Sequence, residues 1–173
     1  VPNRRNLVVS VDEKSTAQIS FGAGFSTVDS IVGQVGYSEE NFDLFNPPWF
    51  RGGGQKLRLR VQYGSLRQDY LLTFIEPWFL GKKLQLSTDF YHHNLGNQSA
   101  NDYYDQVQTG TRLALTGALG SEYVRGTVSY TLENIGILNV SPSAPAVIKH
   151  EEGWQLVSKV GAGLTYGGNL IRW

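Results

Sequence analysis

The segment 55–63 alternates strictly between apolar and polar side chains. Three cations fall on its polar positions within five residues, namely Lys56, Arg58 and Arg60. Alternation with a period of two predicts a β-strand. A soluble β-sandwich would bury the apolar face of such a strand, whereas a membrane barrel turns that face to lipid and the polar face to its lumen. Asp69 and Thr73 occupy polar positions of the following segment, and we expect them to pair with the cations.

The same alternation recurs along the chain and predicts eight strands in all. The other seven segments are 16–26, 31–38, 68–75, 84–91, 106–115, 124–133 and 155–166. Turns or loops separate consecutive segments, so we expect antiparallel hairpins to connect them. The predicted fold is therefore all-β, an antiparallel up-and-down transmembrane β-barrel of about eight strands. Eight strands can close around a lumen filled by side chains.

The predicted connections differ in length between the two ends of the strands. Long polar loops, 92–102 and 134–153, follow the fifth and seventh strands, whereas short turns follow the fourth and sixth. Long extracellular loops and short periplasmic turns are typical of outer-membrane barrels. The segment 39–54 breaks this rule, because it is long and too rich in proline and glycine for a sheet ladder.

Two aromatic groups stand in these connections. Trp49 and Phe50 lie in the segment 39–54, and Trp78 and Phe79 follow the fourth strand. Aromatic rings collect at the headgroup region of membranes, where one end of the ring is wet and the other apolar. We therefore predict that these four residues are interfacial aromatics. Recognition of a protein partner is the alternative reading of the same rings.

The composition narrows the class of protein further. The chain has 173 residues, no net charge, no cysteine and no methionine, which excludes a disulfide framework and a thiolate metal site. No apolar run approaches the roughly 20 residues that a membrane-spanning helix requires. The balanced charge gives no indication of a nucleic-acid partner. Because residue 1 is not methionine, we expect a processed product or a piece of a longer protein.

Candidate chemistry is sparse. His92, His93, Ser99 and Asp102 lie close together in sequence, as a nucleophile and a base would in an outer-membrane acyltransferase or protease. No spacing fixes them together, so we predict no enzyme and no catalytic residue. Adjacent histidines on opposite faces of a strand cannot bind one metal ion. We predict neither a metal nor a cofactor. A passive structural, anchoring or adhesive barrel remains an alternative.

Four blocks of sequence carry a resemblance to a known family. The segments 21–26, 33–42, 52–57 and 74–79 resemble, in order and spacing, the BamA superfamily of outer-membrane assembly barrels. The likeness implies that residues 1–15, with a short strand from Leu7 to Val11, end a periplasmic POTRA-like segment. It also implies that residues 16–173 form the first eight of sixteen barrel strands. Nothing in the chain matches the later eight strands of that family.

The resemblance implies a function in inserting and folding other outer-membrane proteins of a Gram-negative-type bacterium. The first strand would form one side of a lateral gate and pair with an incoming strand by β-augmentation. Gly22 and Gly24 lack side chains to pack, which weakens this strand. The residues expected to pair are Gln18, Ile19, Ser20, Phe21, Gly22, Ala23 and Gly24. Implied partners are the lipid bilayer and nascent outer-membrane proteins, with assembly lipoproteins or periplasmic chaperones as further candidates, but no nucleic acid.

The C-terminal end departs from the family pattern. Tyr166, Gly168, Ile171 and Trp173 resemble the signal that assembly machinery reads on its substrate barrels. Three readings stay open: a piece of a larger barrel, a naturally small closed barrel, or an engineered one. Two chains joining as sixteen strands, a homodimer, is also compatible with the pattern.

Overall fold

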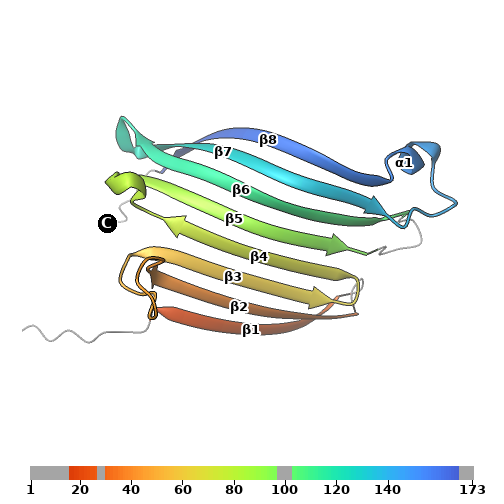
Figure 1. Ribbon diagram of the computed structural model, residues 1–173, viewed down its shortest axis with the longest axis horizontal. Helices are drawn as coiled ribbons and strands as arrows, with labels where there is room; N and C mark the ends of the chain where they lie inside the picture. Colours follow the sequence, from red (N-terminus) through yellow and green to blue (C-terminus); the bar gives the residue numbers. More distant parts are fainter. Residues whose placement is uncertain (1–15, 27–29, 97–102, 168–173) are drawn as a thin grey trace, which may run out of the picture.

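The computed structural model describes residues 16–26, 30–96 and 103–167. The predicted strand from Leu7 to Val11 lies outside these ranges. Eight strands form one sheet, in the order β1-β2-β3-β4-β5-β6-β7-β8 (Figure 1). Their bounds are β1 Ala17–Ser26, β2 Ser30–Phe42, β3 Gln55–Gly64, β4 Arg67–Glu76, β5 Leu84–Leu95, β6 Asp105–Leu119, β7 Ser121–Leu138 and β8 Gly153–Tyr166.

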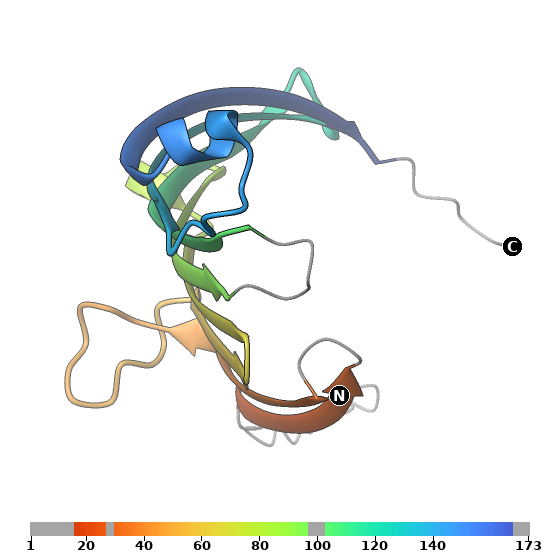
Figure 2. The same ribbon diagram turned by 90° about the vertical axis from the view of Figure 1, so that its right-hand side faces the viewer.

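Each strand pairs antiparallel with its neighbour in sequence. This confirms the predicted all-β, up-and-down architecture. The sheet curves into a trough, and β1 and β8 lie at its two separate rims (Figure 2). No pairing joins β1 to β8 within the described residues. The sheet is therefore open, and the closed eight-stranded barrel is not formed.

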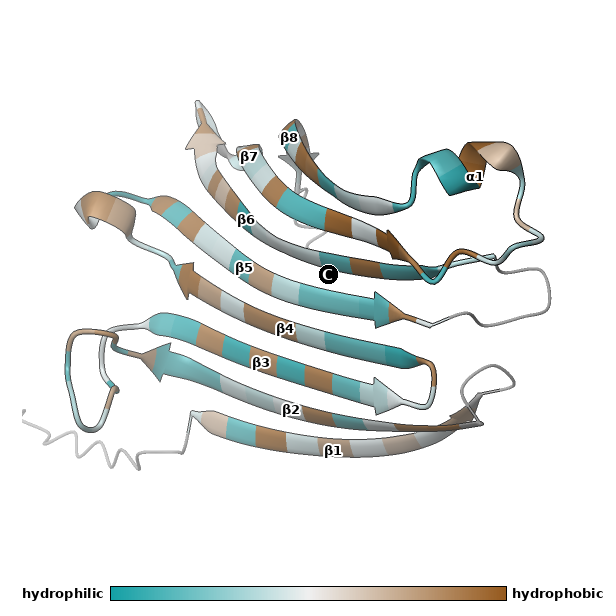
Figure 3. Cartoon of the chain, turned by 45° about the vertical axis from the view of Figure 1, so that its right-hand side comes forward, coloured by the Kyte–Doolittle hydropathy of each residue, from teal (hydrophilic) through white to brown (hydrophobic). Residues whose placement is uncertain are grey.

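The two faces of the trough differ in polarity. Apolar and polar residues alternate along the strands (Figure 3), and the two sets point to opposite faces. The convex face carries exposed rings and aliphatic side chains, such as Phe21 at 79% and Leu164 at 77% exposure. Only Ala114 and Ala144 are buried apolar residues in the described part of the chain. Burial of apolar side chains within the sheet therefore contributes little, and the convex face requires an apolar surrounding such as lipid.

Several strands are longer than the sequence pattern predicts. β2 continues to Phe42 through a register shift between Glu39 and Phe42, whereas we placed that stretch in a loop. β5 runs on to Leu95 and β7 to Leu138. Polar residues occupy both faces of the β2 and β5 extensions, so the alternation fades there while the backbone ladder persists. The predicted short turn after the sixth strand is confirmed, and it is tighter than expected, because only Gly120, with φ 69°, separates β6 from β7.

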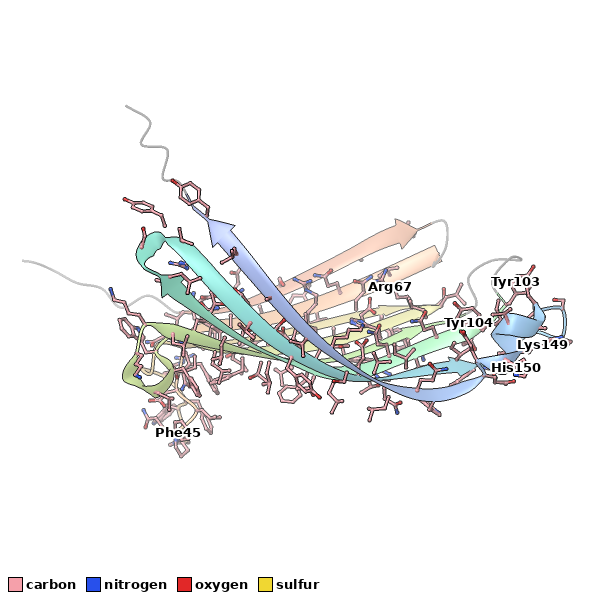
Figure 4. All side chains as sticks on the ribbon, turned by 90° about the horizontal axis from the view of Figure 1, so that it is seen from above. Phe45, Arg67, Tyr103, Tyr104, Lys149 and His150 are labelled. Atoms are coloured by element: carbon pink, nitrogen blue, oxygen red, sulfur yellow. The ribbon has the colours of Figure 1, made fainter. Side chains whose placement is uncertain are left out.

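The helical content is small. A 3-10 helix, η1 (Phe79–Gly81), follows β4, and an α-helix of five residues, α1 (Ala146–His150), precedes β8. In the described ranges, no helix is long and apolar enough to cross a membrane. The loop after β7 is tied to the loop after β5, because the Ser141 amide donates to the Tyr103 carbonyl at 2.7 Å. Figure 4 shows Tyr103, Tyr104, Lys149 and His150 together at this end of the trough.

Candidate functional site

The predicted pairing strand, β1, forms one rim of the trough. Its ladder to β2 runs without a break from the pair Ala17 and Glu39 to the pair Ser26 and Ser30. Because β2 takes up one edge of β1 and no other strand pairs with it in the described residues, the second edge of the stretch 18–26 has no partner strand among them. The stretch from Gln18 to Gly24 lies wholly within this strand. Such an edge is a template for an added strand.

The side chains of β1 do little to hold it in place. Ile19, Phe21 and Phe25 point out from the convex face and are 61%, 79% and 90% exposed. A Cβ atom added at Gly24 would meet nothing within 4 Å, and one added at Gly22 would meet only the Gln34 Cβ at 4.0 Å. Gly22 and Gly24 therefore leave the concave face of β1 without packing contacts, as the sequence predicted. The attachment of β1 therefore rests mainly on its backbone bonds to β2.

One polar contact fastens the beginning of β1. The Thr16 hydroxyl donates a hydrogen bond to a carboxylate oxygen of Glu39 on β2, and the Asn41 amide donates to the same oxygen at 3.1 Å. The Arg51 Nε lies 3.5 Å from the other carboxylate oxygen. The Glu39 side chain is 2% exposed, although it shares the convex face with Ile19. The sequence pattern missed this group, because Glu39 begins the stretch assigned to a loop.

The connection 43–54 covers this part of the convex face. Figure 2 shows it projecting to the convex side of the trough, and Figure 4 places Phe45 there. Phe50 stacks on Phe42 with ring centroids 5.9 Å apart, and Phe42 meets the Phe74 ring edge at 6.4 Å. The buried Gln55 side chain accepts from the Leu44 amide at 2.8 Å and donates to Glu76 at 2.7 Å. Ring stacking and hydrogen bonds therefore seat the connection on β2, β3 and β4.

The four predicted interfacial aromatics lie in the connections at the end where β1 begins. Trp49 and Trp78 are 79% and 57% exposed, while Phe50 is 38% exposed because of its stacking. Phe79 is half-buried at the start of η1. Their common level suits an interfacial ring of aromatic side chains, and their role stays a prediction.

The cations of β3 have a different partner from the one predicted. The Lys56 Nζ and the Arg58 guanidinium lie 2.7 and 2.8 Å from the Glu40 carboxylate on β2. Asp69 instead binds Arg67 at 2.5 Å and His93 at 2.9 Å, and Thr73 donates to Asp89 at 2.8 Å. The prediction was wrong because Glu40 belongs to the unrecognised end of β2. Figure 4 places Arg67 on the concave side, opposite Phe45.

A second polar cluster joins β5 to β8 across the concave face. The Glu133 carboxylate, 2% exposed, accepts from the Tyr91 hydroxyl at 2.6 Å and from the Gln108 amide at 2.6 Å. The Lys159 ammonium forms an ion pair with it. Gly110 leaves the space for this arrangement, since a Cβ there would lie 2.6 Å from the Tyr91 hydroxyl. Polar side chains on the concave face thus satisfy one another here, as expected of residues that face a barrel lumen.

Three concave-face arginines have no such partner. Within the described residues, Arg60, Arg112 and Arg125 lie farther than 4.0 Å from every carboxylate. Arg112 stands directly opposite Asp89 in the ladder between β5 and β6. Arg60 has neutral ladder neighbours, Gly36 and Leu71.

The structure describes only some of the other residues that the sequence analysis singled out. Tyr166 ends β8 and is 77% exposed, while Gly168, Ile171 and Trp173 lie outside the described residues. His92 contacts the Thr109 hydroxyl and His93 contacts Asp69. The two histidine side chains therefore lie on opposite faces of the sheet. Ser99 and Asp102 lie outside the described residues.

An open, antiparallel trough with an apolar convex face and a charged concave face is part of a transmembrane β-barrel. Comparison with known proteins identifies the family to which this barrel belongs. The Omp85 superfamily domain model matches residues 50–168. The chain belongs to the Omp85 superfamily, as its resemblance predicted, and its location is the outer membrane of a Gram-negative-type bacterium. This is a family of assembly factors and not of enzymes, as predicted.

Two relatives define the extent of the likeness. The chain is 33% identical over 101 residues to a protein of Treponema pallidum (strain Nichols) described as "Putative outer membrane protein assembly factor", a match covering 57% of this chain and 12% of that protein. Its fold is similar to the crystal structure of BamA from Haemophilus ducreyi lacking POTRA domains 1–3. That match has a TM-score of 0.61 and 18% identity, covering 93% of this chain and 31% of the other. The chain thus spans a minor part of both relatives.

Proposed function

We propose that this chain forms the first eight strands of the barrel of an outer-membrane protein assembly factor, and that β1 pairs with an incoming strand of a protein under assembly. The observation that carries the proposal is the unpaired edge of β1 in a sheet that does not close. An unpaired row of backbone donors and acceptors is costly in an apolar surrounding. A strand that supplies these hydrogen bonds therefore gains affinity from the backbone alone, and no catalytic side chain is needed.

The character of β1 supports this role. Bare positions at Gly22 and Gly24 and exposed rings on the convex face leave few side-chain contacts for an added strand to displace. The beginning of the strand is fastened by Thr16 and Glu39. In the proposal, residues 1–15 come from a POTRA-like periplasmic segment, so this fastened end faces the periplasm. An incoming strand would be supplied from that side, by chaperones or assembly lipoproteins.

Site-specific disulfide cross-linking tests the proposal, because the chain contains no cysteine. A single Ala23→Cys chain is reconstituted in lipid nanodiscs and mixed with a peptide that copies the C-terminal strand of an outer-membrane protein and carries one cysteine. We expect a disulfide with β1. Val61→Cys is the matched control in the interior strand β3, with the same outward orientation, and should form none.

The position of the cross-link decides between β1 templating and the passive barrel. An Ala162→Cys chain places the same probe on β8, the other rim. Cross-linking that is equal at Ala23→Cys and Ala162→Cys would mean unspecific edge pairing and would contradict templating by β1. No cross-link at either edge would favour the small anchoring or adhesive barrel, in which the strands seal on themselves.

A further inference from the structure

A polar hollow lies on the concave face beside the pairing strand. Its volume is about 400 Å³, and it extends from β1 across β2 and β3 to β4. Gln18 and Ser20 line it from β1, and Arg58 and Arg60 line it from β3. The proposed pairing of β1 uses backbone groups only, so it assigns no role to these side chains.

The charge of the hollow is not balanced within the described residues. Arg58 shares the single carboxylate of Glu40 with Lys56, so two cations face one anion. Arg60 has no carboxylate within 4.0 Å among the residues described, and its side chain is exposed. The β1 side of the hollow contributes neutral groups only. An excess of positive charge therefore faces the rim where a strand would add.

The ladder aligns this charge with specific positions of β1. Ser20, Gly36 and Arg60 stand in one row across β1, β2 and β3, and Gln18, Ser38 and Arg58 stand in the next inward row. A Cβ added at Gly36 would lie 2.5 Å from the Ser20 hydroxyl, so that hydroxyl leans over the glycine. No bulky side chain in these rows separates the β3 arginines from the rim.

An added strand would extend the same rows by one position. Its backbone would lie three strand spacings from β3, about 14 Å. Arginine and glutamate side chains both project over the concave face and shorten this gap. Opposite charges attract without direct contact until the separation exceeds the screening length, about 8–10 Å at physiological salt. A carboxylate opposite Ser20 or Gln18 therefore lies within reach of the positive field, whereas a lysine there is repelled.

We propose that Arg58 and Arg60 select for glutamate or aspartate at the inward-facing positions of a strand that adds to β1, opposite Gln18 or Ser20. The partner is thus an extended segment of another outer-membrane protein with an acidic lumenal residue near its end. This inference rests on the proposed function and specifies the substrate that the edge prefers. Charge complementarity of this kind sets specificity and register more than total affinity.

Three strand peptides that differ at one position test the selection. The inward residue opposite Ser20 is Glu, Gln or Lys, and each peptide carries a fluorophore for anisotropy titration against the full chain in nanodiscs. We expect the Glu peptide to bind roughly 1.5-fold to fivefold more tightly than the Gln peptide, the range of an exposed charge pair. The Lys peptide should bind more weakly than both, and 0.5 M salt should reduce these differences.

Charge reversal supplies the decisive control. Arg60→Glu should invert the order of the three peptides, and Arg60→Gln should weaken it without inversion. Arg125→Glu makes the same change on β7, away from the β1 rim, and should leave the order unchanged. Far-UV circular dichroism confirms that each variant retains its sheet.

The possible failures separate the inference from the proposed function. Equal affinities for the Glu, Gln and Lys peptides, or an order that Arg60→Glu leaves unchanged, would overturn the selection while leaving strand pairing intact. Failure of all three peptides to bind, together with β1 amides that are fully protected without peptide, would mean that the chain's own strand occupies this edge. That result would overturn both.

Discussion

The two rims of the trough are held in different ways. At the β1 rim, Gln18 and Ser20 make no side-chain hydrogen bond within the described residues, and the strand depends on one ladder to β2. From β4 to β8, polar side chains form a chain of contacts across the concave face. Its members are Arg67, Asp69, His93, Tyr91, Gln108, Glu133 and Lys159.

This difference indicates that stability is unevenly distributed in the sheet. A region with few side-chain contacts opens at a lower free energy than a region whose strands are joined by side-chain hydrogen bonds and ion pairs. The glycine and serine positions of β1 and β2 thus leave one rim available for a partner, while the contacts around Glu133 keep the rest of the sheet in register. Binding surfaces require the first property and scaffolds the second.

The largest effect is expected from Glu133→Leu. The change removes a buried carboxylate and leaves the Tyr91 hydroxyl and the Gln108 amide without their partner. We expect the free energy of unfolding to fall by about 2–3 kcal/mol, typical of hydrogen bonds to a charged group. Urea unfolding in detergent micelles, followed by tryptophan fluorescence, measures it. A loss below 0.5 kcal/mol, by the criterion for ordinary surface changes, would show that the cluster does not hold the sheet.

Alanine substitutions at two glycines, one in each region, compare the two regions directly. Alanine at Gly110 would place its Cβ 2.6 Å from the Tyr91 hydroxyl and 2.8 Å from the Glu133 Cβ. We expect Gly110→Ala to cost about 1–2 kcal/mol, since overpacking displaces Tyr91. Gly24→Ala meets open space and should change stability by less than about 0.5 kcal/mol. The same urea titration compares the two, and equal losses would contradict the contrast.

A smaller effect than that of Gly110→Ala is expected where Thr16 holds the beginning of β1. Thr16→Val keeps the shape of the side chain but removes its hydrogen bond to Glu39. We expect a loss of about 0.5–1.5 kcal/mol, confined to faster amide exchange at the beginning of β1. Thr127→Val, which removes a hydroxyl contact with Thr116 between β6 and β7, is the matched control. Faster exchange throughout the sheet after Thr16→Val would argue against local fastening.

The fold was largely predictable, because a period of two survives wherever one face meets lipid. All eight strands and their order follow from that alternation. The pattern loses the strand end where both faces are polar, as at His92 to Asn94 in β5. It also loses residues 134–138 of β7, which were assigned to the long loop that follows. Closure is not encoded in alternation either, since a closed and an open sheet have the same two-residue period.

For the candidate site, the sequence predicted the position of the pairing strand but not the partners of its charged neighbours. The position of β1 and its bare face follow from Gly22, Gly24 and Ser20. The partners of the charged residues do not, because Glu40 was assigned to a loop, whereas β2 continues past Glu39 and sets Glu40 beside Lys56 and Arg58. Glu39 falls on the apolar face and is covered by the connection 43–54. Such covering depends on tertiary packing of a proline-rich segment, which periodicity does not report.

Amide hydrogen exchange of β1, measured by NMR on the full chain in nanodiscs, tests the central claim most directly. The account predicts that every second amide of β1, the set not bonded to β2, exchanges within minutes while β5 to β7 stay protected. Adding a strand peptide should then protect this set. Protection of all β1 amides in the absence of peptide would mean that the edge is already sealed, and would contradict an open edge available for strand pairing.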